Sequence, residues 1–180
     1  LKEQARLQIQ SIGKERPAYE ILNPQSERPL GLSALPPKSP GDLFFDIEGL
    51  PTVEGGLEYL WGVSFYDEKG ERAYRDFWGH DSDAERDAFV EFVDWAYARW
   101  KSFPDMHIYH YGAYEITALR KLMGRHGLRE QEIDTLLRRH VFVDLYGIVR
   151  NGLRLGEPRY SIKNVEHLYR SSRDTDVASG

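Results

Sequence analysis

The sequence predicts an α/β protein with a mixed β-sheet that is flanked by helices. Three segments typical of strands come first, at residues 43–47, 57–66 and 72–78, and residues 67–70 form a turn between the last two. Apolar residues then recur at helical spacing, with further short strands between the helices. A three-strand antiparallel meander followed by α/β crossovers gives a sheet that also contains parallel strands.

The first 40 residues are expected to precede the globular part. Residues 1–12 have the pattern of an amphipathic helix, and residues 16–40 form a linker with prolines at 17, 24, 29, 36, 37 and 40. We expect one domain over residues 41–180, which is long enough to bury a sizeable core. The chain begins without Met or a signal-peptide core, which we interpret as a segment of a longer protein.

Helices alternate with short strands in the second half of the chain. Ser82 and Glu85 have the spacing of a capping box, so a helix is expected from Ser82 to about Lys101. Ser161 is expected to cap a last short helix. The remaining expected elements are a strand at 106–111, helices at 113–126 and 131–139, a strand at 141–143 and a helix after Asp144.

Composition excludes several kinds of site. The chain has no cysteine, which excludes disulfides, thiolate zinc sites and cysteine nucleophiles and fits a reducing compartment. The net charge of −5 does not by itself indicate nucleic-acid binding. No apolar run approaches the roughly 18 residues of a membrane span. We therefore expect a cytoplasmic protein.

Asp46 and Glu48 are the most informative residues. They follow an apolar run, lie two positions apart and precede Gly49. Strand side chains alternate, so both carboxylates face one side while Phe45 and Ile47 face the other. Two such acids repel each other unless a cation neutralises them, and oxygen ligands favour Mg²⁺ or Mn²⁺. A solvated pair of acids is the alternative.

Two further acids are expected near the same sheet edge. Glu115 lies in the first turn of a helix after one strand, and Asp144 ends another strand. Ligands of α/β sheets bind where such strand ends meet. Glu115 has the alternative role of complementing the helix dipole, and Asp144 that of capping a helix. His110 is a ligand, a base or, as we favour, a structural residue.

The segments Phe45–Glu48, Tyr109–Glu115 and Phe142–Leu145 together resemble the ribonuclease-H-like superfamily, in particular DEDD exonucleases of the DnaQ type. The closest resemblance is to the YprB-like ribonuclease-H domain of RecB-family putative nucleases, and Tyr160–Tyr169 resembles that group's penultimate helix. The resemblance covers about residues 41–180. It implies a two-metal phosphodiesterase in which Asp46 and Glu48 hold both ions.

The resemblance also has departures. Glu115 stands where Asp is usual, and Tyr111 where Asn is common, although the longer Glu can still reach a metal. The third motif, His-x-x-x-x-Asp or Tyr-x-x-x-Asp, is missing because Ser172 and Arg173 occupy the Asp positions. Asp174 and Asp176 lie close to the positions that this motif requires but do not match its spacing, so we do not assign them to it. We interpret this as a chain that stops before the last helix, with the fourth acid and general base beyond it.

These observations lead to a functional hypothesis. We expect a metal-dependent nuclease, a 3′–5′ exonuclease on DNA or RNA, with catalytic residues Asp46, Glu48, Glu115 and Asp144 and metal ligands Asp46, Glu48 and Glu115. Two Mg²⁺ or Mn²⁺ ions would lie roughly 3.5–4 Å apart in a complete site. Candidate substrate-binding residues are His110, Arg120, Lys121 and Lys163. The parent chain is expected to carry RecB-like nuclease or helicase domains.

Two alternatives stay open at this point. One is a catalytically inactive nucleic-acid-binding or scaffold module of a larger DNA-processing protein. The other is a ribonuclease-H-like endonuclease, which closed circular substrates would distinguish from an exonuclease.

Overall fold

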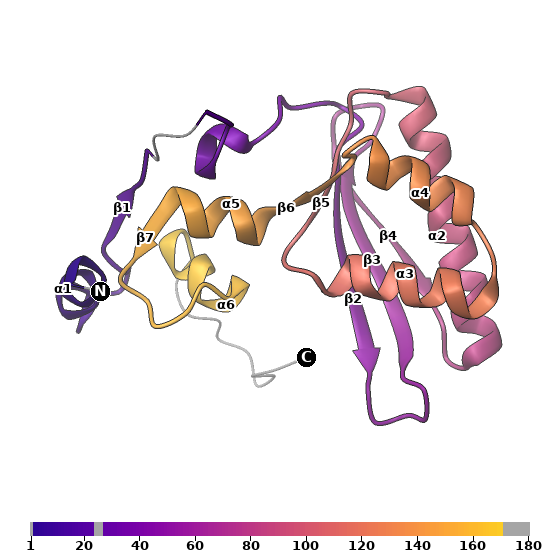
Figure 1. Cartoon of the computed structure of the whole chain (residues 1–180), viewed down its shortest axis with the longest axis horizontal. Coiled ribbons are helices and arrows are strands. Elements are labelled where there is room, and N and C mark those ends of the chain that lie inside the picture. Colours follow the sequence, from indigo (N-terminus) through magenta and orange to yellow (C-terminus); the bar gives the residue numbers. More distant parts are fainter. Residues whose placement is uncertain (1, 24–26, 171–180) are drawn as a thin grey trace. The chain divides into compact units, whose positions relative to one another are not determined.

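The computed structural model describes residues 2–23 and 27–170 (Figure 1). The chain forms two compact units, one of residues 36–144 and one that joins residues 1–35 to those from 145 onward. Each unit is described separately below. The predicted domain boundary between residues 40 and 41 stays a prediction.

The unit of residues 36–144 contains a five-stranded sheet in the order β4-β3-β2-β5-β6. Its strands are β2 (Leu43–Leu50), β3 (Leu57–Tyr66), β4 (Arg72–Trp78), β5 (Ile108–His110) and β6 (Phe142–Asp144). Strands β2, β3 and β4 form an antiparallel meander, whereas β5 runs parallel to both β2 and β6. The predicted mixed sheet is therefore confirmed.

Three helices cover one face of this sheet, and the hydrophobic core lies between the helices and the sheet. They are α2 (Ser82–Ser102), α3 (Tyr114–His126) and α4 (Glu130–Arg138), grouped together beside the strands (Figure 1). The rings of Phe45 and Phe92 stack with centroids 4.3 Å apart, and Trp61 packs against both. In the described residues, no helix is both long and apolar enough to cross a membrane.

Helix α2 begins at Ser82 as predicted, but its capping residue differs from the prediction. Its N-cap is Asp81, whose Oδ1 accepts hydrogen bonds from the backbone N–H groups of Asp83 and Ala84. The Ser82–Glu85 capping box is therefore wrong, because Asp81 supplies the cap one residue earlier. Glu85 is instead fully buried, and its Oε1 accepts a 2.7 Å hydrogen bond from the backbone N–H of Glu58. Its Oε2 forms a 2.9 Å ion pair with the Arg125 guanidinium.

The second unit contains short elements. They are α1 (Lys2–Ser11), β1 (Tyr19–Ile21), a 3-10 turn (Gly31–Ala34), α5 (Leu145–Gly152), β7 (Leu153–Leu155), α6 (Ile162–Val165) and a 3-10 turn (Glu166–Leu168). Strand β1 pairs antiparallel with β7. The loop expected over residues 16–40 thus includes a strand, which is too short to show an alternating pattern. Ser161 caps α6 as predicted.

Replacing Phe92 by Ala should destabilise the protein by about 3–5 kcal/mol, because the ring is 1% exposed and its loss leaves a cavity. Urea unfolding would measure this free energy. The same change at Phe44, which is 44% exposed on the other face, should cost clearly less. Equal losses at the two positions would contradict the described core.

Candidate active site

The strand register brings the predicted acids to one edge of the sheet. Phe44 of β2 pairs with Tyr109 of β5, and His110 of β5 pairs with Asp144 of β6, all in parallel strands. The carboxyl ends of β2, β5 and β6 therefore lie together, where ligands of α/β sheets usually bind. Residues about 100 positions apart in the sequence share this edge.

Asp46 and Glu48 face the side of β2 opposite the helix-covered core. Phe45 and Ile47, between and beside them, are each only 4% exposed, whereas Asp46 is exposed and Glu48 is half-buried. The backbone N–H of Ile47 donates a 3.1 Å hydrogen bond to Asp46 Oδ1. The predicted alternation of these four side chains is confirmed.

Glu115 joins Asp46 from the first turn of α3. Its side chain is 3% exposed, and Glu115 Oε2 is buried without a hydrogen-bond partner. Desolvation, the Glu115 carboxylate and the Glu48 carboxylate, in that order, raise the pKa of Asp46 above its ordinary value. Glu115 therefore lies close enough to Asp46 to influence its ionisation.

His110 borders this pair. Its ring is 5% exposed, and Nδ1 lies 2.7 Å from the Gly112 carbonyl oxygen and 3.5 Å from Glu115 Oε2. Because a carbonyl only accepts, Nδ1 carries the proton and donates to Gly112. His110 thus holds the loop between β5 and α3, which fits the structural role favoured from the sequence.

Asp144 holds the same loop from the other side. Its Oδ1 accepts a 2.8 Å hydrogen bond from Gly112 N. Gly112 has φ of +99°, a conformation that favours glycine. Asp144 therefore lies at the predicted edge and accepts a hydrogen bond from the backbone there. Its catalytic role stays a prediction.

The side chains at this edge offer oxygen atoms, the ligands that a hard cation prefers. Carboxylate oxygens suit Mg²⁺ or Mn²⁺, and the unpartnered Glu115 Oε2 beside Asp46 is the kind of atom that a cation would satisfy. Within residues 2–23 and 27–170, no group of three or more His, Cys, Asp or Glu side chains is arranged to hold a metal ion. The pair Asp46 and Glu115 fits a cation, and Glu48 lies on the same face without completing a three-ligand site.

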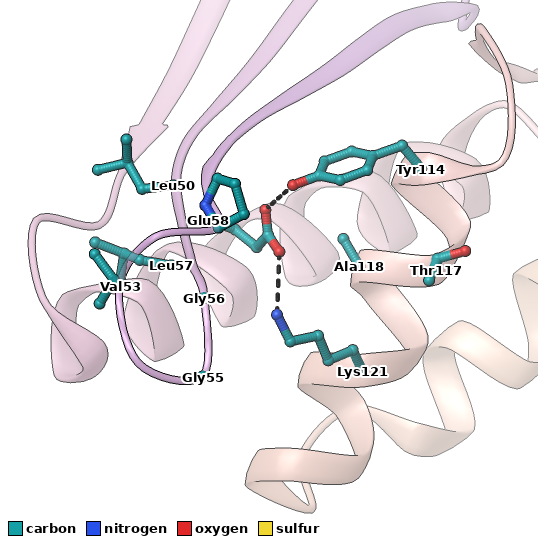
Figure 2. A pocket seen from close by; sticks show the side chains of 11 residues that line it. Leu50, Val53, Gly55, Gly56, Leu57, Glu58, Tyr114, Thr117, Ala118 and Lys121 are labelled. Carbon is teal, nitrogen blue, oxygen red and sulfur yellow. Dashed lines mark hydrogen bonds and ion pairs between the residues drawn. The ribbon is translucent and has the colours of Figure 1, made fainter.

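A pocket of about 430 Å³ adjoins the end of β2 (Figure 2). Its walls are mainly apolar, and its polar groups include Glu58, Tyr114, Thr117 and Lys121. Glu58 contacts both Tyr114 and Lys121. Its Oε2 accepts a 2.7 Å hydrogen bond from the Tyr114 hydroxyl, and its Oε1 is 3.5 Å from Lys121 Nζ. Glu58 was not predicted as a site residue from the sequence, although an acid within an otherwise apolar strand is a signal for one.

The candidate basic residues fall into two groups. Arg120 and Lys121 are exposed on α3, in the same unit as the acids. Lys163 belongs to α6 in the other unit, so it is not placed relative to the acids. Ser172, Arg173, Asp174 and Asp176 of the third-motif region lie outside the described residues.

The raised pKa of Asp46 predicts a pH dependence of stability in metal-free protein. A carboxyl whose pKa is higher in the folded state binds more protons when folded, so its ionisation destabilises the fold as pH rises above the unfolded value of about 3.9. Asp46→Asn should remove this loss and be more stable than wild type at pH 7 in EDTA. Thermal unfolding at pH 4.5 and 7 would measure it. A variant less stable than wild type at pH 7 would contradict the repulsion.

Comparisons with known proteins agree with the fold. A search of curated proteins and a search of solved structures gave no significant match. A family model described as RNase H superfamily matches residues 43–180, which include the whole five-stranded sheet and its three helices. The match spans well over half of the chain. The chain therefore belongs to the RNase H superfamily.

Proposed function

We propose that this protein is a metal-dependent nuclease that hydrolyses phosphodiester bonds of DNA or RNA, acting as a 3′–5′ exonuclease. Membership of the RNase H superfamily supports nuclease chemistry in general. The observation that carries the metal dependence is the pair of Asp46 and Glu115, whose carboxylates meet at the strand ends and raise the pKa of Asp46. A divalent cation would relieve this repulsion.

In this proposal Asp46, Glu48 and Glu115 hold Mg²⁺ or Mn²⁺. The bound ions would supply an activated water and stabilise the leaving 3′ oxygen. Asp46 is exposed and would face the substrate, whereas Glu115 approaches from the buried side. His110 and Asp144 fix the Gly112 loop from which α3 presents Glu115.

The pocket beside β2 supports a nucleic-acid substrate. Its volume of about 430 Å³ lies in the range of small-molecule sites, and its apolar walls suit a base or sugar. Lys121 is its basic side chain, and with Arg120 it would contact phosphates. Lys163 stays a proposed substrate contact from the other unit.

The finer assignments are also proposals. The motif pattern supports a DEDD-type, YprB-like domain that works beside RecB-like nuclease or helicase domains in a cytoplasmic DNA-processing protein. The motif resemblance is what supports these partners.

A second candidate is a catalytically inactive nucleic-acid-binding or scaffold module. The observation that favours it is the lack of a three-ligand arrangement among the described acids. It predicts nucleic-acid binding that is independent of divalent cations.

The proposal is tested with end-labelled single- and double-stranded DNA and RNA in Mn²⁺, using wild type and Asp46→Asn. Wild type should shorten labelled strands from the 3′ end, and the variant should lose at least about 100-fold in rate, because it keeps the shape of Asp46 and removes its charge. EDTA should abolish cleavage.

Arg138→Gln is a matched control, because Arg138 pairs with Asp134 on the exposed surface of α4. It should cleave like wild type. Cleavage that survives in Asp46→Asn would rule out this site, and cation-independent binding without cleavage would favour the scaffold module.

A further inference from the structure

The mutual repulsion of the acidic side chains must be offset by other contacts that hold them close together. Asp46 and Glu48 lie on one strand and Glu115 begins the helix after the neighbouring strand, so three like charges share this sheet edge and repel one another while no cation lies between them. Glu115 comes from the start of a helix and Asp46 from a strand, so the backbone alone does not fix their separation. Their sequence neighbours, Tyr114 and Gly49, are in contact with a third element.

That third element is β3, through Glu58. The Tyr114 hydroxyl donates a 2.7 Å hydrogen bond to Glu58 Oε2, and this carboxylate is only 4% exposed (Figure 2). Glu58 is itself anchored, because its backbone N–H donates to the fully buried Glu85. Tyr114 is therefore hydrogen-bonded to a buried part of the core. We call this pair the Tyr114–Glu58 clamp.

Gly49 leaves room for the clamp. A Cβ atom at Gly49 would overlap both the Tyr114 hydroxyl oxygen and Glu58 Oε2. The pairing of β2 with β3 also shifts register between Glu48 and Gly49. The hydrogen bond therefore passes directly over the backbone that follows Glu48, so β2, β3 and α3 meet at one point between the two acidic segments.

We propose that Tyr114 and Glu58 are positioning residues that hold Glu115 beside Asp46 in the geometry needed to bind a divalent cation. This inference rests on the proposed function. Neither residue is assigned as a metal ligand, because the Tyr114 hydroxyl and the Glu58 carboxylate are occupied with each other and with Lys121. A tyrosine hydroxyl is protonated at neutral pH, so Tyr114 stays a hydrogen-bond donor to Glu58.

The test measures Mn²⁺ binding by electron paramagnetic resonance on the whole chain, without substrate. Tyr114→Phe keeps the ring and removes the donor, so Mn²⁺ affinity should fall by about 10-fold or more, as for other residues that orient ligands. Gly49→Ala should reproduce the loss. Glu58→Gln keeps an acceptor oxygen for Tyr114 and should bind close to wild type.

A matched control separates positioning from stability. Tyr160→Phe likewise removes a partly buried tyrosine hydrogen bond, to Leu153 O in the other unit, and should lower the melting temperature without changing Mn²⁺ affinity. Paramagnetic broadening of backbone amide NMR signals gives the local readout. Mn²⁺ should broaden the signals of Asp46 and Glu115 together in wild type, and those of Glu115 much less in Tyr114→Phe.

The outcomes are distinguishable. Wild-type Mn²⁺ affinity in Tyr114→Phe, with weakened binding in Asp46→Asn, would overturn the clamp and leave the proposed function standing. Mn²⁺ binding that Asp46→Asn does not weaken would overturn the proposed function and the clamp with it. If Gly49→Ala fails to fold, Tyr114→Phe decides, because it adds no atoms.

Discussion

Repulsion between carboxylates at the carboxyl edge of one sheet is the constraint on which this site depends. Asp46 and Glu115 meet there although each loses hydration, and the neighbouring Glu48 adds a third negative charge. A fold accepts this arrangement only when other contacts offset it or when a cation neutralises it. The rest of the site consists of groups that fix these acids in place.

Those groups form two layers behind the acids. His110 and Asp144 bind opposite groups of Gly112 and so hold the loop that leads into α3. Behind β2, the fully buried Glu85 accepts hydrogen bonds from Glu58 N and from Arg125, which connects β3 to α2 and α3. Charged side chains inside this domain thus serve to place other charged side chains, which is a common arrangement around metal sites.

Much of the sheet and of the placement of its acidic residues was predictable from the sequence. The alternation of Phe45, Asp46, Ile47 and Glu48 predicts their two faces, since strand geometry is strictly periodic. The meander and the edge location of Glu115 and Asp144 follow from apolar patterns and connection rules. Contacts that depend on side-chain direction were not predictable: Asp81 displaced Ser82 as the helix cap, and Glu85 turned inward to Glu58. The pairing of Tyr114 with Glu58 joins positions 56 residues apart and leaves no periodic trace in the sequence.

The proposed function of this site depends on the binding of a divalent cation by Asp46 and Glu115. Anomalous scattering from a crystal soaked in Mn²⁺ tests it most directly, because the signal locates the ion itself. We expect an anomalous peak in contact with carboxylate oxygens of both Asp46 and Glu115, with Glu115 Oε2 as one ligand. The absence of a peak at this edge in saturating Mn²⁺ would contradict this proposal.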